Sequence, residues 1–390
     1  MAFLTGRTTF LRFHVVGPKP RHFSEEHLER LATRAAGKSR IASADGIDVG
    51  WTAGDHVLDT DFDLAKNIVN DSLHFEMRID MDKTPSDLLR AYSAIELKAL
   101  SKDNPSGLPS ARQKREAKQA ARERLEEEAK DGRFRKRTCV PVMWDALSNE
   151  LLYGATSYTH LDRLTSHFQQ TFGLKLEAVT AGRRAYQLAE LHERTRAVDD
   201  SSPSKFVADS PAEIAWIADE SSRDFLGNEF LLWLWYYLDQ VDDTITLEDK
   251  SDLTVMMARS LSLECPRGQT GKGTISSEGP TRLPEAKRAV QAGKLPRKAG
   301  LTLVRHDQHY ELSLQAESLG VGSCKLPAMP EDVTDPRARL EERVTQIRNL
   351  VETLDLLFDA FGQKRFAKSW TDELALIQQW LNKRNEPRSQ

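Results

Sequence analysis

The chain has 390 residues, of which 39% are hydrophobic and 29% are charged. These proportions are typical of a folded globular protein and exclude a chain that is disordered throughout. Lysine and arginine number 55 against 59 aspartates and glutamates, a net charge of -4, which excludes a protein that is basic throughout, such as a histone. A local basic surface remains compatible with this sum, because phosphate binding depends on the face presented.

The sequence contains no pattern typical of a secretory signal, a membrane span or a set of paired disulfides. The first residues lack the basic and apolar segments of a secretory signal, and no run of about 18–20 apolar residues predicts a membrane span. The three cysteines, Cys139, Cys265 and Cys324, are far apart and form no C-x-x-C pair. We therefore expect a reduced, cytoplasmic protein without a structural zinc site.

The first third of the chain mixes strand and helix patterns. Alternating aromatic and β-branched residues predict a strand over 8–16, and Ser24 with the acids that follow predicts the start of a helix. Further strands are expected at 48–51 and 74–80, and another helix over 85–97. This alternation favours an α+β arrangement.

A strongly basic segment follows a break at 105–109. Between 112 and 137 there are 11 basic and 6 acidic residues, a net charge of about +5, so the rest of the chain carries about -9. Alanines and long charged side chains predict a helix over 110–131 with almost no apolar face. Four cations lie within about a third of its circumference: Arg112, Arg115, Lys118 and Arg122. A second cluster follows Gly132 and contains Arg133, Arg135, Lys136 and Arg137.

The rest of the chain combines hairpins with apolar helices. A hairpin is predicted over 139–155, an amphipathic helix over 160–172 that ends at Gly173, and a linker over 198–204. The most hydrophobic stretch, 225–238, is too short to span a membrane and predicts a buried helix. Later elements are expected as strands at 253–257 and 260–264, a glycine-rich loop at 266–273, a hairpin over 299–314, and two helices, 335–361 and 370–381, separated at Gly362.

Together these patterns predict an α+β fold with mixed, mainly antiparallel sheets, packed helices and a C-terminal helical hairpin. No internal repeat of about 20–50 residues is visible. Breaks in composition suggest an N-terminal α+β region at 1–200, a second α+β region at 205–330 and the helical hairpin at 331–390.

No pattern in the sequence supports catalysis, a cofactor or a metal. The segment 268–274 resembles a phosphate loop, but Pro266 stands where the first glycine belongs and Gly273 where serine or threonine is needed. The grouped acids lack the surroundings of a two-metal site; they are Asp59, Asp61 and Asp63, then Asp80 and Asp82, then Asp239, Asp242 and Asp243. We therefore expect no catalytic residue, no cofactor and no metal site.

The basic segment is the one signal for a partner. In one interpretation, pairs four residues apart, such as Arg112–Glu116 and Arg122–Glu126, only support an exposed helix. In the other, the aligned cations and an unpaired cluster at 133–137 contact about six phosphates of duplex DNA without sequence preference. Only Phe134 interleaves the cations, which favours backbone contact over stacking on single strands.

The order of several segments resembles the family of recombination-associated proteins called RdgC. These segments are the opening strand at 3–15, 49–51 with Gly50 and Trp51, the helix after Pro85 with the basic helix, 133–134, the hairpin formed by 142–145 and 151–157, 284–286, 292–294 and the hairpin at 298–314. The resemblance covers most of 1–200 and about 280–327. The stretch 225–238, the glycine-rich loop and the C-terminal helices have no clear counterpart.

The resemblance implies a non-enzymatic DNA-binding protein. Members of the family form a ring-shaped homodimer whose positively charged hole encloses duplex DNA. They restrain the action of RecA-type recombinase in homologous recombination. An exonuclease label also travels with the family, and the missing metal-ligand pattern argues against that activity here.

The predicted DNA-binding residues are Arg112, Arg115, Lys118, Arg122, Arg133, Arg135, Lys136, Arg137, Lys294 and Lys298, the last two from the family segment. The expected partners are duplex DNA, a second copy of the chain and a RecA-type recombinase, at the nucleoid in the cytoplasm. Two alternatives remain. One is a metal-dependent exonuclease on recombination intermediates, and the other is a protein-interaction scaffold that docks a partner through Leu350, Leu354, Phe358 and Trp380.

Overall fold

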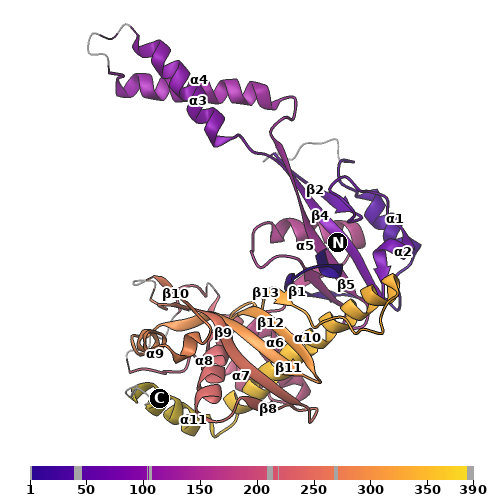
Figure 1. Cartoon of the computed structure of the whole chain (residues 1–390), viewed down its shortest axis with the longest axis vertical. Coiled ribbons are helices and arrows are strands. Elements are labelled where there is room, and N and C mark those ends of the chain that lie inside the picture. The colour runs from indigo at the N-terminus through magenta and orange to yellow at the C-terminus, as the bar shows by residue number, and fades with distance from the viewer. Residues whose placement is uncertain are drawn as a thin grey trace. The chain divides into compact units, whose positions relative to one another are not determined.

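The computed structural model has an α+β fold with a mainly antiparallel sheet, as the sequence predicts (Figure 1). The residues that the structure describes are 2–38, 46–102, 104, 108–208, 214–217, 219–267 and 271–383. They form two compact units, and strands β4 and β5 contribute residues to both. The first unit comprises Met1–Ser24, Leu64–His74 and Pro141–Gln390, and the second comprises Glu25–Asp63 and Phe75–Val140.

Antiparallel pairing orders the strands of the first unit as β10, β9, β11, β12, β13, β1, β6 and the end of β5. Three further strands lie off this order: β7 pairs with β1, β8 pairs with β9, and β3 pairs with the first residues of β4. The bounds are β1 (Thr8–Val16), β3 (Ile68–Val69), β4 (Ser72–Asp82), β5 (Arg135–Asp145), β6 (Glu150–Tyr153), β7 (Lys175–Ala178), β8 (Thr244–Thr246), β9 (Asp252–Glu264), β10 (Lys272–Ser277), β11 (Leu295–Arg305), β12 (Gln308–Gln315) and β13 (Val321–Lys325).

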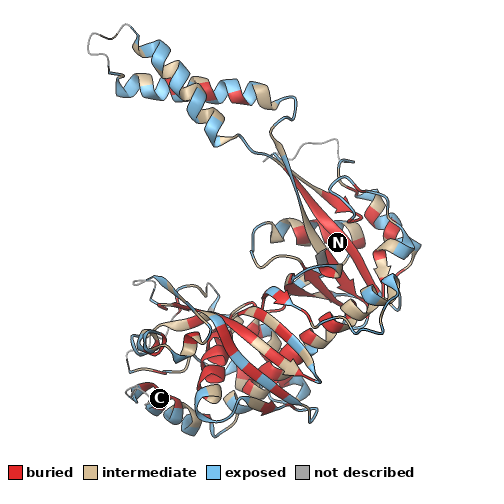
Figure 2. Cartoon of the chain, in the orientation of Figure 1, coloured by how far each residue is buried: buried red, intermediate tan, exposed pale blue. Residues whose placement is uncertain are grey.

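Helices α6, α10 and α11 of the first unit pack around α8, which is apolar on nearly all sides and therefore buried. It contacts β11, α6, α10 and α11, and its buried residues are red in Figure 2. Phe230 of α8 meets Phe358 of α10 with ring centroids 5.3 Å apart, and Trp235 meets Trp380 of α11 at 5.4 Å. The bounds are η1 (Ala2–Leu4), α2 (Leu64–Asn67), α5 (Leu161–Phe172), α6 (Ala181–Leu191), α7 (Thr195–Asp199), η2 (Glu220–Ser222), α8 (Phe225–Gln240), η3 (Pro280–Arg282), α9 (Pro284–Gln291), α10 (Pro336–Arg365) and α11 (Trp370–Asn382).

The second unit contains α1 (Glu25–Thr33), β2 (Ile47–Thr52), most of β4, the start of β5, α3 (Ser86–Ser101) and α4 (Ala111–Ala129). Strand β2 runs antiparallel to β4, and Trp51 packs edge-on against Phe75 with ring centroids 5.0 Å apart. Gly50 is required there, because a side chain would overlap the backbone of Ala36. Helices α3 and α4 pack against each other.

The division into units does not follow the three ranges suggested by composition. Strand β1 pairs with β13 on one side and with β6 on the other, so residues from 1–200 and 205–330 share one sheet. Helices α10 and α11 complete the core of that same unit. Val198 of the expected linker is buried, and Ser204 accepts a hydrogen bond from the Trp370 indole at 3.1 Å. Non-local strand pairing therefore decides the division.

Two boundaries differ from the sequence prediction. The segments expected as strands at 253–257 and 260–264 are one strand, β9, whose pairing with β11 shifts where Arg259 takes a positive φ of 69°. This irregularity interrupts the alternating pattern without ending the strand. Gly362 was expected to separate two helices, but α10 continues past it to Arg365. Tertiary packing of α10 outweighs the low helix propensity of one glycine.

The residues proposed for a docking scaffold are inside the molecule. Leu350 and Phe358 lie in α10, Trp380 lies in α11, and each is at most 3% exposed, while Leu354 is 7% exposed. All four belong to the core of the first unit, so they do not present a docking face. Within the described residues, no helix is both long enough and apolar enough to cross a membrane.

Two helical glycines give a matched test of the core. A methyl group at Gly227 in α8 would overlap the backbone carbonyl of Ala316, whereas at Gly362 in α10 the nearest atom belongs to Phe366 at 3.8 Å. We predict that Gly227→Ala lowers the free energy of unfolding by about 1–3 kcal/mol. Gly362→Ala should leave it unchanged or raise it by up to about 1 kcal/mol. Urea denaturation measures both, and equal effects would contradict the packing of α8.

Candidate functional site

Helix α4 (Ala111–Ala129) begins close to where its sequence predicts. Ser110 accepts a hydrogen bond from the backbone N–H of Gln113, whose side chain accepts one from the backbone of Ser110, which is a capping box. Its buried residues are Ala117, Ala121 and Leu125, four residues apart on one face. The remaining faces are mostly exposed in Figure 2, and they carry the charged residues.

Three cations form a basic face on one flank of α4. Arg115, Lys118 and Arg122 lie within about 60° of one another around the helix. Each is exposed, and none has an ion pair within the described part of the chain. The fourth predicted cation, Arg112, instead donates to Glu116 at 2.8 Å. This is the pair expected if the segment were only an exposed helix. We call Arg115, Lys118 and Arg122 the basic face.

The prediction that the cluster at 133–137 is unpaired was wrong. Arg133 pairs with Asp131 at 2.6 Å. Arg135 pairs with Asp48, and its Nε also lies 3.6 Å from Asp80. Arg137 contacts the same Asp80 carboxylate at 3.8 Å.

Two of these carboxylates come from β2 and β4, far from the cluster in sequence. The local sequence around 133–137 therefore could not reveal them. Lys136 is exposed and has no ion pair among the described residues, so it stays available for a partner.

The remaining two predicted cations belong to the first unit. Lys294 precedes β11 and Lys298 lies within it, and both are half-buried. Neither has an ion pair with another described residue. We do not count them in the basic face, because that face belongs to the second unit.

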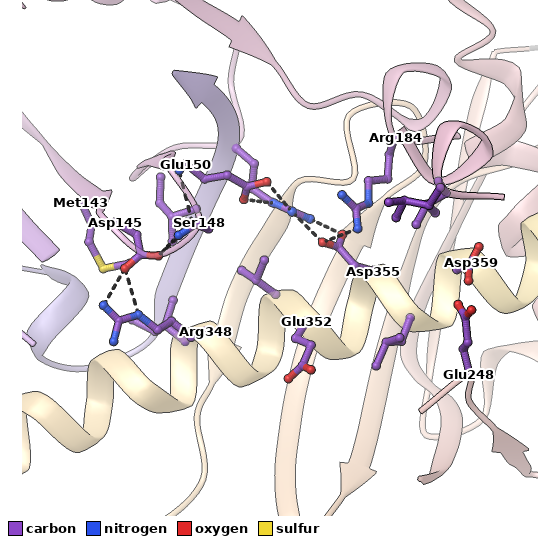
Figure 3. A pocket seen from close by; sticks show the side chains of 17 residues that line it. Met143, Asp145, Ser148, Glu150, Arg184, Glu248, Arg348, Glu352, Asp355 and Asp359 are labelled. Carbon is purple, nitrogen blue, oxygen red and sulfur yellow. Dashed lines mark hydrogen bonds and ion pairs between the residues drawn. The ribbon is translucent and has the colours of Figure 1, made fainter. Parts of the chain in front are cut away.

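A cavity of about 430 Å³ lies within the first unit, along α10 (Figure 3). Arginines and carboxylates that are buried or half-buried line it. Arg12 makes two hydrogen bonds to Glu150, at 2.9 and 3.0 Å, and two to Asp355, at 2.6 and 2.9 Å. Arg184 pairs with Asp355 at 2.9 Å. These charges largely neutralise one another.

The ion pairs keep Arg12 charged in an apolar interior. Burial opposes its charge, but the carboxylates of Asp355 and Glu150 raise the pKa of its guanidinium above the ordinary value. Because β1, β6 and α10 each supply one member, the network joins three elements of the first unit. The network therefore stabilises the packing of these three elements.

One end of the cavity holds a second charged group that the sequence did not reveal. His192, Glu248 and Asp359 place one ligand-type atom each within 4.8 Å of the others. A hydrogen bond with Asp359, together with burial and repulsion by that carboxylate, raises the pKa of Glu248. The three residues are far apart in the chain and follow no ligand spacing, so no sequence signal could have found them.

Members of the acid groups noted in the sequence pair with protein donors. Asp59 accepts hydrogen bonds from the backbone N–H groups of Asp55 and Asp61, at 3.0 and 3.1 Å. Asp80 pairs with Arg78 at 2.9 Å, and Asp239 accepts from the indole of Trp380 at 2.7 Å. Across the described residues, none of these sets forms a group of metal-ligand geometry.

Comparison with known proteins adds no relative. No protein-family model matches the chain, and no curated protein matches it. The resemblance to the RdgC family therefore rests on the ordered segments described above.

The buried network makes a clear prediction for stability. Arg12→Met leaves Glu150 without its arginine, while Asp355 keeps Arg184. We expect a loss of about 3–5 kcal/mol in the free energy of unfolding, because a buried carboxylate is left uncompensated. Urea denaturation measures this loss. Arg196→Met is the control, because Arg196 is 93% exposed in its pair with Asp200 and should cost less than about 1 kcal/mol. Similar losses in both variants would show that the network contributes little.

Proposed function

We propose that this protein binds duplex DNA without sequence preference through the basic face of α4, with Lys136 as a further contact. The observation that carries the proposal is the free charge of this face: Arg115, Lys118 and Arg122 are exposed and aligned without ion pairs in the described chain. Along the helix axis they span about 10 Å, at 1.5 Å per residue. Duplex DNA presents about one phosphate charge per 1.7 Å of its axis, so one face of this length meets several phosphates.

The distribution of charge supports the same proposal. The segment 112–137 carries about +5 in a chain whose net charge is -4. An acidic remainder limits nonspecific attraction to DNA elsewhere on the surface, while the basic face supplies the contacts. The capping box and the buried stripe Ala117, Ala121 and Leu125 hold α4 as a helix, which keeps its cations aligned.

We further propose the assembly and role that the RdgC resemblance implies. In this proposal two copies form a ring-shaped homodimer around duplex DNA, at the nucleoid in the cytoplasm, and restrain a RecA-type recombinase without acting as an enzyme. The ordered segments that resemble the family support this part. Because a closed ring threads onto DNA ends, linear DNA should load faster than closed circular DNA of the same sequence.

A salt titration tests the DNA interface. Four unpaired cations, Arg115, Lys118, Arg122 and Lys136, predict a slope of log K against log salt near about -3.6. This slope is shallower than the six contacts expected from sequence would give, because the structure pairs Arg112, Arg133, Arg135 and Arg137. We expect the triple variant Arg115→Gln, Lys118→Gln, Arg122→Gln to reduce the slope to about -1. Fluorescence anisotropy with labelled duplex measures it.

The matched control replaces three paired cations, by Arg112→Gln, Arg133→Gln and Arg137→Gln. Its slope should stay within about one unit of the wild type, because those charges are already partly neutralised. An unchanged slope in the basic-face variant would remove α4 from the interface. Adding Mg²⁺ or Mn²⁺ to the same labelled duplex tests the alternative exonuclease, which would shorten it.

A further inference from the structure

Three metal-ligand side chains from separate elements converge at one end of the cavity. His192 follows the last residue of α6, Glu248 lies in the turn between β8 and β9, and Asp359 lies in α10. The His192 Nε2 atom is 3.3 Å from the Asp359 carboxylate and 3.7 Å from that of Glu248. Figure 3 shows the carboxylates of Glu248 and Asp359 close together at this end. All three residues belong to the first unit.

These separations fit ligands around a common ion better than direct hydrogen bonds. A good hydrogen bond from an imidazole nitrogen to a carboxylate is about 2.7–3.2 Å long. Ligands at about 2.0–2.2 Å from a tetrahedral Zn²⁺ stand about 3.3–3.6 Å apart. The 3.3 Å distance falls within this second spacing, the 3.7 Å distance is slightly longer, and the His192–Asp359 hydrogen bond to Oδ2 is long at 3.4 Å.

Asp359 also lacks the arginine partner that the other buried or half-buried aspartates of the cavity have. Asp359 is 2% exposed. Asp145, Glu150 and Asp355 of the same cavity each pair with an arginine, whereas among the described residues Asp359 has no arginine or lysine within pairing distance. A buried carboxylate next to a second carboxylate is costly unless a proton or a cation lies between them.

The surroundings suit an ion with an open coordination position. Gln363 donates to the Oδ2 atom of Asp359 at 3.2 Å, which orients the carboxylate as a second-layer partner does at metal sites. Glu248 and Asp359 both line the cavity, so a ligand in the cavity can reach an ion held by them. Three protein ligands and one open position are typical of reactive rather than structural zinc sites.

We propose that His192, Glu248 and Asp359 bind one divalent transition-metal ion, with Zn²⁺ as the best fit, and leave one coordination position open to the cavity. One nitrogen and two oxygen donors without sulfur suit Zn²⁺ or Mn²⁺ better than Cu⁺ or an iron–sulfur cluster. The sequence predicted no metal site, because the ligands come from three distant segments. The proposal is independent of DNA binding, which uses the second unit.

Zinc titration of the full chain tests the site. After dialysis against a chelator, isothermal titration calorimetry should show one Zn²⁺ per wild-type chain, and Zn²⁺ should raise the Tm because it binds the folded state. Glu248→Gln should raise the Kd at least about tenfold, and His192→Ala should abolish saturable binding. Glu248 is half-exposed, so its variant is expected to fold even if changes at Asp359 do not.

The control is His309→Ala, which removes an exposed histidine outside the cluster. It should bind Zn²⁺ with the wild-type stoichiometry and Kd. The proposal is overturned if wild type binds no stoichiometric Zn²⁺, if Glu248→Gln and His192→Ala both keep the wild-type Kd, or if His309→Ala loses binding equally. DNA affinity measured in the same variants should not change, which keeps this test separate from that of the basic face.

Discussion

The pairing of buried arginines with carboxylates is the interaction on which the first unit depends. Arg12 is 2% exposed, and its guanidinium contacts Glu150 of β6 and Asp355 of α10. Asp355 lies 343 residues later in the chain than Arg12. Because an isolated charge is expensive in an apolar interior, the fold must bring these three residues together. The same pairing holds β1 against α10, and α8 packs its apolar side chains against α10.

Charge pairing also decides which surface cations are free to bind a partner. Asp48 and Asp80 of the second unit pair with Arg135 and Arg137, although the local sequence around these two arginines shows no such partner. On α4 the acids lie mainly on another flank than the basic face, so Arg115, Lys118 and Arg122 stay unpaired in the described chain. The candidate DNA interface is therefore smaller than the basic composition suggests, and it consists of one side of α4 together with Lys136 of β5.

Asp359 is the informative exception to this pairing. It is as buried as Arg12, yet the residues nearest to it are an imidazole, an amide and a second carboxylate. The other carboxylates of the cavity wall, Asp145, Glu150 and Asp355, each pair with an arginine, whereas Asp359 faces a set of donors that a metal ion would complete. The exception lies beside the cavity, where a bound ion would be reached by a small ligand.

Local patterns in the sequence determined most of the elements. The alternation over 8–16, the alanines and long charged side chains of α4, Gly173 at the end of α5 and the apolar run of α8 each act over a few neighbours, so each could be predicted. Gly173 takes the left-handed conformation, with a φ of 73°, that ends a helix. The α+β class followed from the same local patterns.

Only the tertiary structure decided how distant segments meet. Pairing of β1 with β13 merges regions that composition had separated, and the bulge at Arg259 joins two expected strands into one. The partners of Arg135, the network of Arg12 and the cluster of His192, Glu248 and Asp359 each join residues far apart in the chain. Such contacts depend on which backbones the sheet and core bring side by side, and no spacing within a single segment records that.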